Sequence, residues 1–528
     1  MNRRFLFILA IAALFILTAC SSLLNGESPY HYPPGYEYED EPLPDPQPIQ
    51  RTQAPAGFLP DDGILRLSMR HPLTLNPLLN EDVTVAPILR LLFEPLIVFD
   101  ENLRPADKLA HMELASDFAS AILTIRHDAI WSDGMPVTSD DLIFSVEVLR
   151  LAPDTVIYKR NVENIARIDR VDAKTVHIIF AQASITAAYA LNFPIIPQHY
   201  YRGHINPRSP LNMAPLGNGP YILQSIVPMQ SITLERNPYT FRNRAKIEQV
   251  QVLFIPDAET KIHAFDQGVV DAVRLPFAEW VKHRSIKPVN PEEFPAMYFE
   301  FVGFNFQRDI FNDIEIRQGI AQAFNIDEAM NAVYLHQAVR AVSPIHPRSW
   351  MHDNQVDGPG YDPARATQLL RFVNPQEPLE ILVNTEHIER VHIAERLAAG
   401  LNAARLPAEV IALPFDEYYS RLTYGYFDLF LGGMILDFAP DFAFMFQGGA
   451  LFGIDLEMEA LFAGLNIAST ETAFLQAVSQ LQQGFTDRLP IISLGFRHSA
   501  VLTGTRVTQG RAPASDNVFG FVNEWEIK

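Results

Sequence analysis

The sequence predicts a mixed α/β protein made of two or three lobes. With 528 residues, the chain is longer than one hydrophobic core usually serves, so more than one lobe is expected. From about residue 63 onward, stretches in which apolar and polar side chains alternate, as in strands, are followed by stretches of helical periodicity. This succession of strands and helices is typical of mixed α/β lobes.

The composition argues against one class of partner. Apolar residues make up 48% of the chain and charged residues 20%, a balance found in well-packed globular proteins. The formal net charge is −21, and no basic stripe interrupts the acidic side chains. Because such a surface repels phosphates, we expect no nucleic-acid partner.

Residues 1–19 are predicted to be a lipoprotein signal peptide. Arg3 and Arg4 precede an almost wholly apolar run that is too short to span a membrane comfortably. Cys20 follows and is the only cysteine of the chain. The string Leu-Thr-Ala-Cys at 17–20 resembles the bacterial lipobox, which implies cleavage before Cys20 and acylation of its thiol. The alternative is an uncleaved signal anchor with a chance cysteine.

The segment 20–60 is predicted to be a lipidated tether. Residues 21–60 contain nine prolines, and proline fixes φ and lacks a backbone donor, so we expect an extended, disordered segment here. Acyl chains contribute roughly 0.8 kcal/mol per buried CH₂, and a lipoprotein carries enough of them for stable anchoring. The folded body would therefore be held near the lipid bilayer, on the outer side of the cell membrane.

The segment 123–144 carries the most information about the folded body. Its start alternates like a strand, residues 132–134 form a Ser-Asp-Gly turn, and Thr138 with Asp141 predicts a capped helix start. The run resembles the hallmark segment of the family-five extracellular solute-binding proteins, which include oligopeptide, dipeptide and nickel binders. In that family the segment is structural, so we assign it no chemistry.

Further segments resemble the same family and follow in its order. They are a glycine turn, a stretch ending in Arg-Asn-Pro-Tyr that resembles the family's Arg-Asn-Pro-x-Tyr pattern, and three helix or strand boundaries, at residues 215–221, 232–239, 264–271, 304–324 and 361–370. Asn218 departs from the Thr or Ser that is usual there. At the last boundary Asp362 is expected to be an N-cap, with Pro363 at the first helical position.

The resemblance implies a periplasmic-binding-protein-like fold of type II (cluster C). Two large lobes and one inserted smaller lobe would surround a hinged cleft that closes over a ligand. The implied divisions are lobe I at 61–96, 195–280 and 487–528, the inserted lobe at 97–194, and lobe II at 281–486. The chain would cross between the large lobes near residues 280 and 487.

The resemblance also implies a ligand site in lobe II. In peptide-binding relatives the aspartate of a similar segment pairs with the peptide's α-amino group, and that position matches Asp437. Met434 replaces the tryptophan of the family pattern, and no arginine precedes the segment to receive a ligand carboxylate. The residues implied as ligand contacts are Asp437, Phe438, Met434, Gly433, Tyr418, Tyr419 and Phe442. Alternatively, Asp437 caps a turn before Pro440, and the aromatic side chains belong to the core.

Catalytic and metal sites are not expected. His387 and His392 do not have the spacing of a zinc peptidase motif, and no tight His/Cys cluster suggests bound nickel. Neither a P-loop nor a Gly-x-Ser-x-Gly nucleophile elbow occurs. We therefore expect no cofactor and no enzymatic reaction.

The sequence is best explained as a monomeric, membrane-anchored receptor. It would capture peptides and deliver them to the permease of an ABC importer. Within the same class, the alternative ligand is a nickel chelate or an oligosaccharide. From other classes, a surface lipoprotein for signalling or chaperoning remains open, and a hydrolase is the last alternative.

Overall fold

The computed structural model describes residues 63–528, except 242–243, 276–280, 284–287, 447–450, 452 and 512–516. The predictions made for the signal peptide, Cys20 and the tether lie outside the described residues. Within the described part of the chain, no helix has the length and apolar character needed to cross a membrane.

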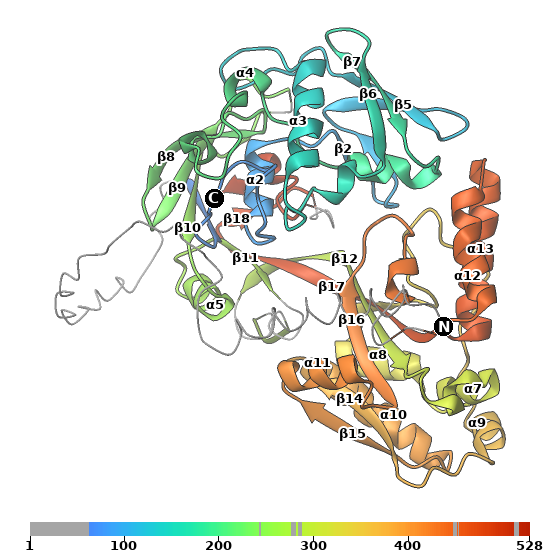
Figure 1. Ribbon diagram of the computed structural model, residues 1–528. Helices are drawn as coiled ribbons and strands as arrows, with labels where there is room; N and C mark the ends of the chain where they lie inside the picture. The colour runs from blue at the N-terminus through green and yellow to red at the C-terminus, as the bar shows by residue number, and fades with distance from the viewer. Residues whose placement is uncertain are drawn as a thin grey trace, which may run out of the picture. The chain divides into compact units, whose positions relative to one another are not determined.

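Lobe I is built around a four-stranded sheet whose strands come from distant parts of the chain (Figure 1). The strand order is β1-β10-β9-β8, and β1 runs parallel to β10 while the other pairs are antiparallel. These strands are β1 (Ile64–Met69), β8 (Tyr221–Val227), β9 (Ser231–Arg236) and β10 (Gln249–Phe254). Its helices are α2 (Ala86–Leu92), α4 (Gln198–Tyr201) and α5 (Ala258–Asp266), and η3 (Pro210–Met213) is a short 3-10 helix.

The glycine turn of lobe I is required by close packing. A Cβ atom added to Gly217 or Gly219 would collide with the carbonyl oxygens of Leu92 and Leu91, at the end of α2. Only glycine permits this approach of two backbones. Asn218 between them is buried, and its Oδ1 accepts a hydrogen bond of 3.0 Å from Glu94 N.

The inserted lobe has its own antiparallel sheet, in the order β4-β5-β7-β6. Its strands are β2 (Ile97–Phe99), β3 (Pro105–Asp107), β4 (Ala110–Leu114), β5 (Ser120–Ile125), β6 (Ile165–Arg170) and β7 (Thr175–Phe180). Its helices are α3 (Ser139–Leu151) and the 3-10 helices η1 (Arg160–Val162) and η2 (Ile185–Leu191). β2 and β3 pair separately as a short ribbon.

The predicted helix start in this lobe is present. Thr138 is the N-cap of α3 and forms a capping box with Asp141. The buried Asp141 carboxylate also accepts hydrogen bonds from Trp131 Nε1 (3.1 Å) and from Gln198 N (2.7 Å). One carboxylate thus ties the loop before α3, the start of α3 and the start of α4 together, which explains why this segment serves structure.

Lobe II contains most of a mixed sheet in the order β11-β17-β12-β16-β14-β15, with β13 paired to β17. The strands are β11 (Ala272–Leu275), β12 (Val289–Phe304), β13 (Ala338–Arg340), β14 (Leu379–Asn384), β15 (Ala408–Leu413), β16 (Leu429–Ile435) and β17 (Ile491–Gly504). The helices are α7 (Ile314–Gln322), α8 (Ile326–Tyr334), α9 (Pro363–Leu370), α10 (Ile388–Ala403), α11 (Phe415–Tyr424), α12 (Leu456–Ile467) and α13 (Glu471–Arg488), of which α12 and α13 lie side by side (Figure 1). The short elements of lobe II are η4 (Asp309–Asn312) and η5 (Ala443–Phe446). The C-terminal elements β18 (Val507–Thr508), η7 (Val522–Glu524) and β19 (Glu526–Ile527) belong to the segment predicted as part of lobe I.

Two long neighbouring strands, β12 and β17, connect the cores of the lobes (Figure 1). Phe294 of β12 and Val501 of β17 pack into a core that lobe I shares with the inserted lobe, whereas Phe299 and Phe496 pack into a core formed mainly by lobe II. The register of the pair shifts between Pro295 and Tyr298, and such a bulge bends and twists a strand locally. We expected the chain to cross between the large lobes near residues 280 and 487, and β12 and β17 begin shortly after these positions. The exact division into lobes stays a prediction.

Candidate functional site

The segment that follows β16 contacts the inserted lobe. The ring of Phe438 stacks on Phe99 of β2, with centroids 4.3 Å apart and planes inclined by 26°. Phe99 in turn stacks on Tyr189 of η2 at 5.5 Å. The sheet pairing ends just before this contact, where Leu436 N donates to Met297 O at 2.8 Å. The chain therefore leaves the sheet after Leu436 and contacts the inserted lobe at Phe438.

Asp437 is exposed to water, yet protein surrounds its carboxylate. Its side chain is exposed, and no ion pair or hydrogen bond to it occurs among the described residues. Yet the protein around it removes enough water to raise the pKa of Asp437; the charge of Arg160 opposes this rise and that of Asp441 adds to it. A side chain can be reached by water and still be surrounded by protein, and Asp437 has both properties.

Arg160 brings the opposite charge from the other lobe. It begins η1, which packs against η2 of the same lobe. Its side chain is exposed, and no acidic partner lies within ion-pair distance in the described part of the chain. The gap between the inserted lobe and the segment after β16 thus carries an acid on one side and a base on the other, and neither is neutralised by a direct protein contact. Such a pair can hold a ligand that carries both charges.

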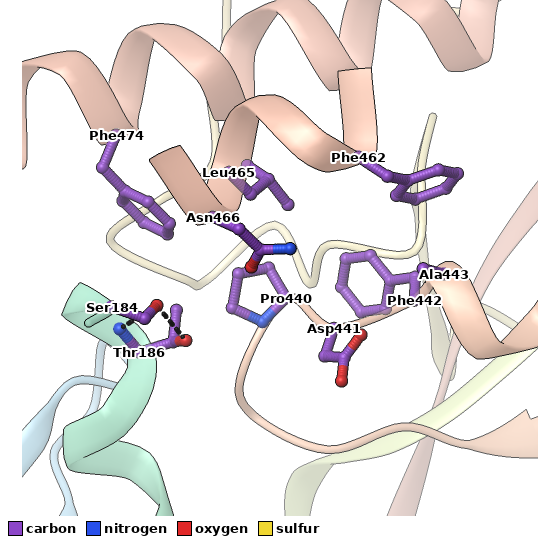
Figure 2. A pocket seen from close by; sticks show the side chains of 10 residues that line it. All are labelled: Ser184, Thr186, Pro440, Asp441, Phe442, Ala443, Phe462, Leu465, Asn466 and Phe474. Atoms are coloured by element: carbon purple, nitrogen blue, oxygen red, sulfur yellow. Dashed lines mark hydrogen bonds between the residues drawn. The ribbon is translucent and has the colours of Figure 1, made fainter. Parts of the chain in front are cut away.

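A small pocket lies beside this region, between the two lobes. Ser184 and Thr186 approach it from the start of η2, whereas Asp441, Phe442 and Asn466 belong to the opposite wall (Figure 2). The remaining lining residues are Pro440, Ala443, Phe462, Leu465 and Phe474. Its volume of about 40 Å³ suits a few water molecules and is too small for a peptide. The pocket therefore marks the edge of the interlobe contact rather than the place of the ligand.

Gly433 covers a buried group of charges. A Cβ atom at this position would collide with Arg390 Nη2 and lie 2.6 Å from Glu300 Oε2. The Glu300 carboxylate is 1% exposed and accepts hydrogen bonds from Arg390 Nε (2.7 Å) and Nη2 (3.2 Å). Arg497 Nε lies 2.9 Å from Glu300 Oε1. The glycine is needed here because β16 passes directly over this ion cluster.

The other residues implied as ligand contacts lie in three different settings. Phe442 is buried and lines the pocket, and Met434 is half-buried against the lobe II core. Tyr418 is buried in α11 and donates its hydroxyl to Leu431 O at 2.8 Å. Tyr419 is 61% exposed and stacks on Phe415, with ring centroids 6.0 Å apart. The structure thus brings Asp437, Phe438 and Phe442 to the interlobe contact and gives Tyr418 and Tyr419 other surroundings.

Sequence reasoning missed the part of this region that comes from elsewhere in the chain. Arg160, Phe99 and Tyr189 belong to the inserted lobe, and Trp350 belongs to a loop of lobe II. Trp350 Nε1 donates to the Tyr189 hydroxyl at 2.7 Å. A tryptophan in a loop rich in proline and histidine was the one local sign available, since loops seldom need a large aromatic side chain.

A family model that matches most of the chain identifies the family of this protein. The model of "Bacterial extracellular solute-binding proteins, family 5 Middle" matches residues 105–450. The chain belongs to this family. As a family-five solute-binding protein it has the two-lobed α/β fold of type II periplasmic binding proteins, so the predicted family and fold class are both confirmed.

Relatives of this family-five protein are similar over part of their length. A putative ABC transporter peptide-binding protein of Brucella ovis is 24% identical over 302 residues, which cover 55% of this chain and 57% of the relative. The dipeptide-binding protein of Escherichia coli K12 is 24% identical over 271 residues, or 49% of this chain and 51% of the relative. The chain thus spans little more than half the length of these curated relatives.

One solved structure shows the similarity of the fold over a longer stretch. The ABC transporter substrate-binding protein CtaP of Listeria monocytogenes superimposes with a TM-score of 0.77 at 18% identity. The superposition covers 88% of this chain and 99% of the Listeria chain.

Proposed function

We propose that this protein captures peptides for an ABC importer and delivers them to a membrane permease. Its family binds extracellular solutes, and the relatives from Brucella and Escherichia coli are named for peptides and dipeptides. The observation that carries the proposal is Asp437, an exposed carboxylate in protein-lined surroundings with no direct partner among the described residues. A charge that has lost water without gaining a protein partner is well prepared for a charged ligand.

In this proposal the peptide's α-ammonium group meets Asp437. Closure of the cleft removes water from both charges, and the resulting charge-assisted hydrogen bonds compensate for that loss. Arg160 supports a second contact, to a carboxylate or to an acidic side chain of the peptide, because its guanidinium is exposed and belongs to the opposite lobe. Pairing with the peptide backbone would add affinity that does not depend on the peptide's sequence.

The proposed work of the protein is burial of a ligand, without a chemical step. Peptide transport requires that the ligand leave unchanged, so the site needs charges and shape rather than a nucleophile. In the described residues, no group of three or more His, Cys, Asp or Glu side chains is arranged to hold a metal ion. Independently of that finding, we propose a receptor that acts as a monomer and carries no cofactor.

The proposed location is the outer side of the cell membrane. The family description places its members outside the cytoplasm, in a periplasm or at an extracellular face. Acylation of Cys20 would anchor the chain to the bilayer, and the proline-rich residues 21–60 would allow the lobes to reach a permease.

The proposal is tested by mass spectrometry of ligands that co-purify with the protein from its native host. A series of peptides is the expected result, and Asp437→Asn protein prepared in parallel should lose them. A sugar or a nickel chelate would move the assignment to the other ligand classes. Protein that is consistently empty would point to a role outside transport and contradict the proposal.

A further inference from the structure

Trp350 of lobe II contacts the inserted lobe through its backbone N–H, its indole N–H and its ring. Its backbone N–H donates to Asn102 O at 2.9 Å, and its Nε1 donates to the Tyr189 hydroxyl at 2.7 Å. The Arg104 guanidinium lies over its ring, 4.2 Å from the centroid. Three groups of the inserted lobe therefore contact one residue of lobe II, through its backbone N–H, its indole N–H and its ring.

The partners of Trp350 are themselves fixed. Burial raises the pKa of Tyr189, so its hydroxyl stays protonated and donates to Leu103 O at 3.1 Å while accepting from Trp350. Arg104 Nη2 lies 2.6 Å from Glu471 Oε2, at the first residue of α13. This ion pair is about half exposed on both sides and adds little by itself. It orients the guanidinium over the Trp350 ring.

The contacts continue from Trp350 to the proposed ligand carboxylate. Tyr189 receives the indole hydrogen bond and stacks on Phe99 at 5.5 Å, and Phe99 stacks on Phe438 at 4.3 Å. Phe438 directly follows Asp437. A chain of four aromatic side chains thus runs from the Trp350 loop to the ligand segment, crossing twice between the inserted lobe and lobe II.

We infer that Trp350, Tyr189, Phe99 and Phe438 form a closure latch, which joins the inserted lobe to lobe II and positions Asp437 for the ligand. This inference rests on the proposed function for its ligand and on the contacts for its geometry. The stacked rings and hydrogen bonds of the latch belong to an apolar contact between the lobes that also includes Leu103 and Ile185 of the inserted lobe. Such contacts can form and separate as the lobes move. Trp350 and Tyr189 are positioning residues, because they act on the ligand through Phe438.

A latch that favours the closed state raises the apparent affinity in proportion to the closed population. Weakening it should therefore speed ligand release and leave the charge recognition at Asp437 intact. The inserted lobe then takes part in closure, and lobe I is not the only partner of lobe II.

The test compares hydroxyl and indole deletions with a matched control. Tyr189→Phe removes a hydroxyl that bridges two lobes, and Trp350→Phe keeps a ring but removes the indole donor. Tyr221→Phe is the control, because Tyr221 is buried in lobe I and donates its hydroxyl to Ile247 O at 3.1 Å. Arg104→Gln, which should act like Trp350→Phe but more weakly, has its own control in Arg126→Gln, since Arg126 also pairs with a carboxylate (Asp128) and lies over a ring (Phe241), and both partners lie outside lobe II.

Two measurements are made on the full chain with Cys20→Ser and spin labels at the exposed positions Val171 and Glu409. Pulsed electron paramagnetic resonance gives the distance between the two labels, and so between the inserted lobe and lobe II. It is measured with and without tri-alanine as the probe ligand. Stopped-flow binding of tri-alanine gives its association and dissociation rates.

We expect Trp350→Phe and Tyr189→Phe to broaden the interlobe distance toward open forms and to raise the dissociation rate about 10-fold, equivalent to about 1.4 kcal/mol. Association should change little, and both controls should match the parent protein. Unchanged distances and rates in both latch variants would overturn the inference, as would a loss of thermal stability without any change in distance. If tri-alanine fails to bind the parent but the latch variants still alter the distance, the latch stands and the peptide assignment fails.

Discussion

Replacing Asp437 with asparagine removes one charge and keeps the shape of the side chain. If Asp437 meets a peptide ammonium, the substitution leaves that ammonium buried in the closed cleft without its counter-charge. Removing one partner of a buried charge pair costs about 2–5 kcal/mol. The Asp437 side chain is exposed in this structure, so the lower end of that range applies. We expect a loss of about 2 kcal/mol, which is roughly 30-fold in the dissociation constant.

Calorimetry with peptides in two forms separates this contact from a general effect of charge. Wild-type protein should bind a free-amine peptide about 30-fold more tightly than its N-acetylated form. Asp437→Asn protein should bind both forms equally, because the acetyl group and the mutation remove the same interaction. Asp154→Asn changes the net charge equally on an exposed loop of the inserted lobe and should leave both affinities unchanged. Equal affinity of wild-type protein for the two peptide forms would refute the reasoning.

Three further outcomes are expected. Because the pKa of Asp437 is raised, its carboxylate takes up a proton at a higher pH than an ordinary aspartate. Calorimetry should therefore show the affinity for free-amine peptides falling on mild acidification. An unchanged affinity at that pH would contradict the raised pKa. Gly433→Ala should lower the free energy of unfolding by about 3 kcal/mol, since its Cβ meets Arg390 and Glu300; Gly360→Ala, where no atom lies within 4 Å of the added Cβ, should be close to neutral in the same denaturant titration. Cys20→Ala should move the protein from the membrane fraction to the soluble fraction, and a variant that stays in the membrane would exclude this anchor.

Local sequence patterns determined many boundaries of this fold. Thr138 and Asp141 predicted the start of α3, and the capping box is present. Asp362 and Pro363 predicted the start of α9, where Asp362 Oδ1 accepts from Arg365 N at 2.9 Å. These features depend on residues three or four apart, so a short stretch of sequence contains the whole interaction.

Local sequence patterns did not predict which side chains of the candidate site are buried and which are exposed. Tyr418 and Tyr419 are neighbours in sequence, yet one is buried and the other is 61% exposed. Likewise, Gly433 and Met434 face opposite sides of β16, because successive strand residues alternate. Which side faces a cleft is set by the pairing of β16 with β12 and by the helices that cover each face, and a shift of one residue would exchange them.

The sequence by itself determined the family and the α/β class, because those depend on ordered motifs, and it predicted Asp437 as a ligand contact. Only the tertiary structure decided that the charge of Arg160 acts on Asp437 and that Phe99 stacks on Phe438. It also decided that Trp350 contacts the inserted lobe. These partners lie in separate parts of the chain, and their meeting depends on how β12 and β17 join the lobes. The physical reason is that contacts between lobes arise from packing over long sequence distances, on which no local periodicity carries information.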